Sequence, residues 1–261
     1  RFEDGAMERI VLFGDSITQQ GWAAGGWAGQ LAERYVRRAD VLNRGLSGWN
    51  TRWAKAALEH IFDPVDIRGA LVTVFFGAND SVLEARNKRQ HVPLAEYATN
   101  LEHIVRFLQR GGAHVVVITP PPVAPQKWAQ FLHSRGDGDG VTSDRVMSNT
   151  AEYAAAAAEV AERCGAAVVD MFGGMQAALP GEACAAALSD GLHLGPAANA
   201  VLFELLVRCI ASHVPRFAVD VEGDSSPLGR LCPLHGELSH DTDVAALVPP
   251  RGASAASAAA P

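Results

Sequence analysis

Residues 9–20 read Arg-Ile-Val-Leu-Phe-Gly-Asp-Ser-Ile-Thr-Gln-Gln, and this stretch decides the fold. The apolar run at 10–13 predicts a strand buried on both faces, as in parallel sheets, and Gly14 ends it. Ser16 therefore follows the carboxyl end of a strand, where open α/β sheets place their ligand crevices. The same residues are also typical of a strand-to-helix turn with an N-cap, so they do not establish a nucleophile by themselves.

Hydrophobic periodicity beyond this stretch predicts strands that alternate with helices. The expected strands are at 10–13, 41–44, 71–76, 115–118 and 167–170, and the expected helices are at 26–37, 51–61, 94–108, 143–163 and 197–214. This alternation predicts right-handed βαβ units, hence a parallel sheet with helices on both faces. We expect one doubly wound α/β domain, in which the hydrophobic periodicity runs from about residue 7 to 217. We therefore divide the chain into a domain at residues 1–218 and a tail at residues 219–261.

Two stretches lack this periodicity. Residues 123–141 contain Gly136-Asp-Gly-Asp-Gly140 and are predicted to form a long flexible loop near the crevice, serving as a lid or rim. Residues 219–261 are acidic and rich in Ala and Pro, so we expect a disordered C-terminal tail. Four of its residues have metal-ligand chemistry but irregular spacing, which argues against zinc: Cys232, His235, His240 and Asp241. We expect neither a metal nor a cofactor.

The net charge of −7 arises largely in that tail. Residues 219–261 hold six acids against two arginines, which leaves −3 for the body. A body with so little net charge does not point to nucleic acid or to an anionic membrane as a partner. The 48% hydrophobic content is sufficient for a sizeable core.

The cysteines and the amino terminus bear on the compartment. The four cysteines form no C-x-x-C pair, which favours reduced thiols in an intracellular protein: Cys164, Cys184, Cys209 and Cys232. The sequence has no run of 18 apolar residues and no secretion-signal pattern. We therefore expect a cytoplasmic protein, although the chain begins with Arg and a leader outside this sequence stays open.

A second polar stretch, Ser189-Asp190-Gly191-Leu192-His193, lies near the end of the body. A carboxylate three residues before a histidine is able to hold one imidazole nitrogen while the other faces a nucleophile, as in a Ser-His-Asp triad. A lone histidine in a loop is more often a solvated surface residue. Its pairing with Asp190, together with the motif at Ser16, favours catalysis here.

The chain resembles the SGNH (GDSL-type) hydrolase family in four blocks that occur in order. These are Gly14-Asp-Ser16, Gly48 in Arg44-Gly-Leu-Ser-Gly48, Gly77-Ala-Asn-Asp80 and Asp190-Gly-Leu-His193. Within the family it is most similar to the isoamyl acetate-hydrolysing esterases, through Phe75-Phe-Gly-Ala-Asn-Asp-Ser81, Gln90-His-Val-Pro-Leu94 and Asp190-Gly-Leu-His-Leu194. The resemblance covers roughly residues 9–215 and implies a flavodoxin-like three-layer α/β/α sandwich, here with a five-stranded parallel sheet.

The resemblance also implies roles for individual residues. Ser16 is the expected nucleophile, His193 its base, and Asp190 the residue that orients His193. The expected oxyanion hole is the backbone N–H of Ser16, the backbone N–H of Gly48 and the side-chain amide of Asn79. Gly48 as a plain turn residue and Asn79 as a capping residue are the alternatives.

Three residues beside these blocks are candidates for the walls of the substrate pocket: Asp15, Trp22 and Trp49. Trp27 also follows one of these blocks and is a further candidate. Large aromatic side chains near a core more often serve packing, and Asp15 is equally suited to bonding nearby backbone N–H groups.

These features predict a metal-free serine carboxylic ester hydrolase that acts on small short-chain esters such as acetates. A carbohydrate O-acetyl esterase, a thioesterase or a lysophospholipase would use the same triad. The alternative from another class is a flavodoxin-like binding module whose loop at 14–20 cradles a phosphate, but the sequence lacks the G-K-[ST] lysine. The expected partner is a small-molecule ester, and assembly into a homodimer stays open.

Overall fold

The computed structural model describes residues 8–63 and 67–219, and its centre is one all-parallel sheet with strand order β2-β1-β3-β4-β5. The strands are β1 (Glu8–Gly14), β2 (Ala39–Gly45), β3 (Leu71–Phe75), β4 (His114–Ile118) and β5 (Ala167–Val169). The order reverses between β1 and β3, so the crevice expected at a topological switch point lies at the carboxyl ends of these two strands. The predicted five-stranded parallel sheet and flavodoxin-like fold are confirmed.

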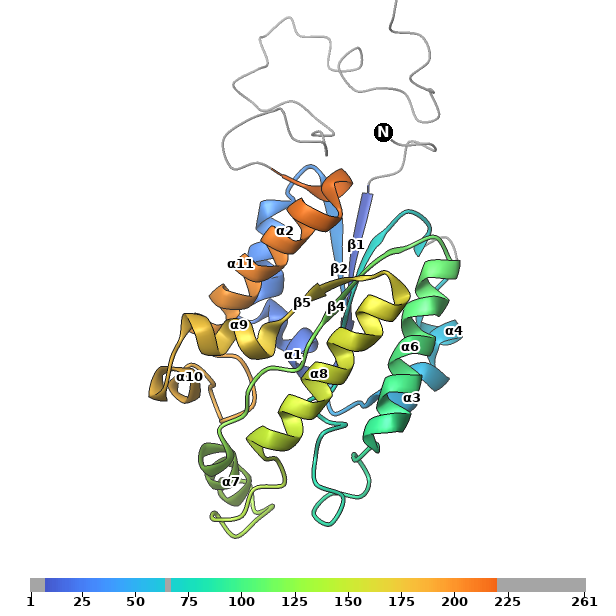
Figure 1. Cartoon of the computed structure of the whole chain (residues 1–261). Coiled ribbons are helices and arrows are strands. Elements are labelled where there is room, and N and C mark those ends of the chain that lie inside the picture. The colour runs from blue at the N-terminus through green and yellow to red at the C-terminus, as the bar shows by residue number, and fades with distance from the viewer. Residues whose placement is uncertain (1–7, 64–66, 220–261) are drawn as a thin grey trace, which may run out of the picture.

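Helices cover both faces of the sheet (Figure 1). One face carries α2 (Trp27–Arg34), α9 (Met171–Ala178) and α11 (Pro196–His213). The other carries α3 (Thr51–Ala56), α4 (Leu58–Ile61), α6 (Leu94–Arg110) and α8 (Met147–Cys164). In β1, Ile10 and Leu12 belong to the first core cluster, whereas Val11 and Phe13 belong to the second. This alternation explains why residues 10–13 of the strand are hydrophobic at every position.

Several helix boundaries differ from the prediction. The helix expected at 26–37 ends at Arg34, and Arg37 then adopts a left-handed conformation with φ 63° just before β2 begins. The helix expected at 51–61 is divided between α3 and α4. The helix expected at 143–163 starts only at Met147, because Ser143 Oγ accepts from the Arg145 N–H and competes with helix formation.

The prediction of a continuous flexible loop at 123–141 is wrong, because α7 (Pro125–Ser134) occupies its first half. Pro125 begins the helix, where proline is favoured, and Trp128 and Ala129 are buried. Phe131 and Leu132 pack against the first core cluster. The glycine-rich part after α7 had suggested a loop, but the spacing of Trp128, Phe131 and Leu132 is that of one helical face.

Two further short helices, α1 (Ser16–Gln19) and α10 (Glu182–Ala186), were not predicted, and neither was α9. No helix within residues 8–63 and 67–219 is long and apolar enough to cross a membrane. The predicted tail beyond Val219 lies outside the described residues, as do its four candidate zinc ligands.

Candidate active site

Ser16 is the first residue of α1, directly beyond the carboxyl end of β1. Asp15 caps this helix, since its Oδ1 accepts from the Ile17 N–H at 2.9 Å. The Asp15 N–H donates to the carbonyl of Phe75 at 3.3 Å, which ties the turn to the end of β3. The Ser16 side chain is thereby placed at the switch point of the sheet, and the residue is only 5% exposed.

Ser16, His193 and Asp190 form one chain of hydrogen bonds, although 177 residues separate the first two. Ser16 Oγ lies 2.8 Å from His193 Nε2, and His193 Nδ1 lies 2.6 Å from Asp190 Oδ2. The second carboxylate oxygen, Asp190 Oδ1, accepts from the backbone N–H groups of Leu192 and His193 at 2.9 and 2.8 Å. A hydroxyl, an imidazole and a carboxylate in this order can transfer a proton away from the hydroxyl.

The electrostatics of Asp190 suit an ionised carboxylate. Burial alone would raise its pKa, but the hydrogen bonds from the His193 ring and from the backbone N–H groups of His193 and Leu192 outweigh burial. The net result is a pKa below the ordinary value. Asp190 therefore carries its negative charge at neutral pH and stabilises a positively charged imidazole.

The loop that carries Asp190 and His193 packs tightly on α7. Gly191 has φ 98°, and a Cβ at this position would lie 2.4 Å from the backbone nitrogen of Trp128. The Ala124 N–H donates to the Gly191 carbonyl at 2.8 Å, and the Trp128 ring meets the His193 ring edge-on at 6.1 Å. The helix that was predicted to be a loop thus supports the histidine.

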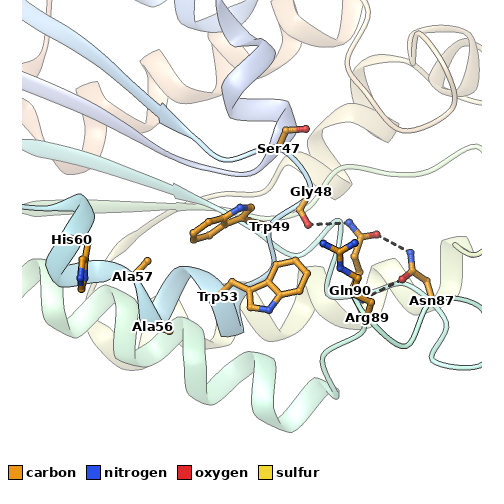
Figure 2. A pocket seen from close by; sticks show the side chains of 10 residues that line it. All are labelled: Ser47, Gly48, Trp49, Trp53, Ala56, Ala57, His60, Asn87, Arg89 and Gln90. Atoms are coloured by element: carbon orange, nitrogen blue, oxygen red, sulfur yellow. Dashed lines mark hydrogen bonds between the residues drawn. The ribbon is translucent and has the colours of Figure 1, made fainter.

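Gly48 and Asn79 lie after β2 and β3 and are fastened to each other. Gly48 has φ 79°, in the left-handed region that favours glycine. Asn79 is 3% exposed, and its Nδ2 donates to the Trp49 carbonyl at 2.9 Å. Gln90 Nε2 donates both to the Gly48 carbonyl at 2.9 Å (Figure 2) and to Asn79 Oδ1 at 3.3 Å. The Leu46 N–H donates to the Gly14 carbonyl, so both loops share the edge of the sheet with Ser16.

Asp80, next to Asn79, is a fully buried carboxyl. Its Oδ1 accepts from the Thr51 backbone N–H at 2.9 Å and from the Thr51 hydroxyl at 2.5 Å, which joins this loop to the start of α3. Burial raises the pKa of Asp80 to about 7 in spite of these bonds. Burial likewise raises the pKa of Asp15 to about 6.

We expect Asp80→Asn to flatten the pH dependence of stability. A carboxyl whose pKa is raised on folding contributes stability that is present below the unfolded pKa of about 4 and is lost as pH rises toward about 7. Each such group lowers the free energy of unfolding by roughly 1.4 kcal/mol per pH unit in that window. Urea unfolding at pH 5, 6, 7 and 8 measures this slope. An equal slope in the variant and the wild type would contradict the assignment to Asp80.

A cavity of about 880 Å³ adjoins Gly48. Its lining includes Trp49, Trp53, Ala56 and Ala57, so much of its wall is aromatic or aliphatic (Figure 2). The remaining lining residues are Ser47, Gly48, His60, Asn87, Arg89 and Gln90.

Two of the three predicted wall residues do not line this cavity. Trp49 does, but Asp15 is buried beneath α1 as its cap, and Trp22 is 47% exposed in the short turn Gln20–Trp22. Trp27 is a core residue whose indole N–H donates to the Ile17 carbonyl at 3.3 Å.

Four residues around the site were not predicted: Trp53, Gln90, Trp128 and Arg145. Trp53 was detectable as an aromatic residue on the helix after Gly48. Gln90 belongs to a block that carries the family resemblance, but nothing in that block indicates its hydrogen bonds. No sequence motif included Asp144 or Arg145. Within the part of the chain that the structure describes, no group of three or more His, Cys, Asp or Glu side chains could hold a metal ion.

Comparison with known proteins shows which family the chain resembles over most of its length. The GDSL-like lipase/acylhydrolase family model matches residues 12–201. The human isoamyl acetate-hydrolyzing esterase 1 homolog is 44% identical over 212 residues, which cover 79% of this chain and 82% of that protein. A GDSL esterase/lipase of Arabidopsis thaliana, At5g62930, is 41% identical over 207 residues, covering 76% and 84%.

Solved structures are similar as well. The lipase/acylhydrolase from Enterococcus faecalis superposes with a TM-score of 0.62 at 26% identity, covering 79% of this chain and 96% of that one. The acetylxylan esterase Axe2 from Geobacillus stearothermophilus gives a TM-score of 0.61 at 22% identity, covering 80% and 96%, and supports the fold alone.

Proposed function

Because the chain belongs to the GDSL-like lipase/acylhydrolase family and is a carboxylic ester hydrolase, we propose that it cleaves short-chain, acetate-type esters through an acyl-enzyme on Ser16. The observation that carries this proposal is the unbroken chain of hydrogen bonds from Ser16 Oγ through the His193 ring to the Asp190 carboxylate. These three groups supply the activated hydroxyl, the base and the orienting charge that acyl transfer requires.

The proposed reaction has two halves with the same proton carrier. Ser16 Oγ attacks the ester carbonyl carbon while its proton moves to His193 Nε2. The tetrahedral intermediate then collapses, the bond to the alcohol oxygen breaks, and the alcohol leaves with that proton. Water attacks the acyl-enzyme in the second half, again losing a proton to His193, and the carboxylic acid departs as Ser16 recovers its proton. Asp190 holds the ring orientation throughout and stabilises its charged form.

The oxyanion of each tetrahedral intermediate needs donors, and we assign three groups to this role. Ser16 begins α1, so its backbone N–H is among the helix N-terminal groups without an intrahelical acceptor. The left-handed conformation of Gly48 supports close approach of its backbone to a substrate. Asn79 adds a neutral side-chain amide donor, which ionised Asp cannot provide. Loss of one such donor typically lowers kcat by about 10²–10³.

The cavity at Gly48 supports a small apolar ester as the substrate, since Gly48 of the proposed oxyanion hole lines it although the three triad residues do not. Its walls include two indoles and two alanines, which suit a short alkyl group better than a sugar. The human relative that shares 44% identity is named for isoamyl acetate hydrolysis, which is consistent with this choice. A carbohydrate O-acetyl esterase, a thioesterase and a lysophospholipase would use the same three catalytic groups, so the test must compare substrates.

Initial rates over p-nitrophenyl esters from C2 to C12, isoamyl acetate and acetylated xylo-oligosaccharides test the proposal. We expect the highest kcat/KM for C2 to C4 esters and isoamyl acetate. A preference for the sugar acetates would instead identify a carbohydrate esterase, and a preference for C8 to C12 would contradict the short-chain assignment. Absence of hydrolysis of every ester would reject the proposal.

We expect Trp53→Ala to shift the acyl-length preference toward longer esters. Removing the indole of Trp53 enlarges the cavity, so a longer acyl chain gains space. The ratio of kcat/KM for the C8 ester to that for the C2 ester should rise by roughly tenfold. Trp22→Ala is the matched control, because Trp22 does not line the cavity. An unchanged ratio in Trp53→Ala would place the acyl group elsewhere.

A further inference from the structure

Arg145 is a buried arginine beside the candidate oxyanion hole, in the segment that precedes α8. Its side chain is only 3% exposed. Nε donates to the Ala78 carbonyl at 3.2 Å, Nη2 donates to Asn79 Oδ1 at 3.1 Å, and Nη1 donates to Asp144 Oδ1 at 2.8 Å. The guanidinium therefore contacts the backbone and the side chain of the loop that follows β3.

The guanidinium is itself held rigidly. It stacks over the Trp128 ring with its central carbon 4.7 Å from the ring centroid. The Trp128 indole N–H donates to the same Asp144 oxygen at 2.7 Å. Burial lowers the pKa of Arg145, but the proximity of Asp144 opposes this and the arginine remains charged in a protein.

The hydrogen bonds of Asn79 determine which end of its amide faces the site. Its Oδ1 accepts from two donors, Arg145 Nη2 and Gln90 Nε2. One N–H of Nδ2 is used by the Trp49 carbonyl. An amide rotated by 180° would set N–H groups against the two donors and leave them without an acceptor. The second N–H of Nδ2 is therefore the only part of the amide left for a substrate oxygen.

We propose that Arg145 is a positioning residue for ester hydrolysis, which locks the Asn79 amide with its free N–H toward the oxyanion. This inference rests on the proposed function, because it assigns Asn79 the donor role. Arg145 acts through Asn79 and touches no reacting atom. The bond from Arg145 is charge-assisted and so contributes more to the lock than the neutral bond from Gln90.

A lysine cannot replace this arginine. Arg145 reaches three acceptors, on Ala78, Asn79 and Asp144, in the plane of one fork. An ammonium group is a compact point charge that cannot match this planar set. Arg145→Lys is therefore expected to retain the charge but lose the orientation of the amide.

A double-mutant cycle of Arg145→Met and Asn79→Ala, followed by kcat and KM for p-nitrophenyl acetate, tests the inference. We expect Arg145→Met to lower kcat by about 10- to 100-fold with KM changed less than threefold, and Asn79→Ala to lower kcat by about 10²–10³. In the Asn79→Ala background, Arg145→Met should lower kcat by less than threefold, because the group through which it acts is already gone. Arg145→Lys should resemble Arg145→Met.

The control is Arg216→Met, which removes an arginine paired with Glu8 at the start of β1, and it should keep wild-type kcat. The inference is wrong, and the proposed function is unaffected, if Arg145→Met lowers kcat by the same factor in the wild-type and Asn79→Ala backgrounds. Wild-type kcat in Arg145→Met has the same meaning. Wild-type kcat in Asn79→Ala would overturn both the inference and the proposed oxyanion hole. If circular dichroism shows that Arg145→Met does not fold, the double-mutant cycle is measured with Arg145→Lys instead. The same outcomes then support or overturn the inference.

Discussion

Replacing Ser16 with alanine is expected to lower kcat for p-nitrophenyl acetate by about 10⁴–10⁶, the range found when one member of a serine triad is removed. The variant loses one oxygen whose partner is the His193 ring, and Ser16 is not part of the wall of the cavity at Gly48. KM should accordingly remain within a few-fold of wild type wherever residual turnover is measurable. The measurement is steady-state hydrolysis with enzyme purified free of other esterases.

Two comparisons make this result decisive. Ser134→Ala, at the exposed end of α7, removes a hydroxyl that donates to the nearby Phe131 carbonyl and should leave kcat unchanged. Far-UV circular dichroism should be the same for both variants and wild type. A loss of less than tenfold in Ser16→Ala would show that another group carries out the attack.

His193→Ala is expected to cost nearly as much as Ser16→Ala. Without the imidazole, the Ser16 hydroxyl loses the one base that bonds to it among the residues that the structure describes, and Asp190 loses the ring through which it acts. The variant should fold, because Asp190 retains its bonds from the backbone N–H groups of residues 192 and 193.

The two residues should also act as one unit, so the double variant of Ser16 and His193 is expected to be no slower than either single variant. Non-additivity of this kind is typical of triads. If the fold loss of kcat in the double variant equals the product of the two single losses, Ser16 and His193 have independent roles.

The three central strands, β1, β3 and β4, were predictable because they are buried on both faces and therefore read as nearly uninterrupted apolar runs. The helix α7 was missed because the composition of the glycine-rich turn that follows it outweighed the spacing of Trp128, Phe131 and Leu132. Helix α1 is only four residues long, too short for a periodic pattern. The sequence nevertheless offered Asp15 as an N-cap residue, as the alternative to a catalytic role for this turn.

The candidate triad residues stand in short local motifs, so Ser16, Asp190 and His193 could be named from the sequence. Gln90 and Arg145 could not, because their contacts with Asn79 join segments 11 and 66 residues apart. Such contacts depend on how the loops at the end of the sheet fold over one another. The sequence offered Asp15 both as a pocket wall and as a structural residue, and its hydrogen bond from the Ile17 N–H agrees with the structural role.

The central claim is that the Ser16 hydroxyl is a nucleophile activated by His193. Labelling with a fluorophosphonate, followed by intact mass and peptide mapping, tests it most directly. We expect one adduct on wild-type protein, mapped to the peptide that contains Ser16, strongly slowed labelling of His193→Ala and no adduct on Ser16→Ala. An adduct on Ser16→Ala, or a wild-type adduct on a different serine, would contradict it.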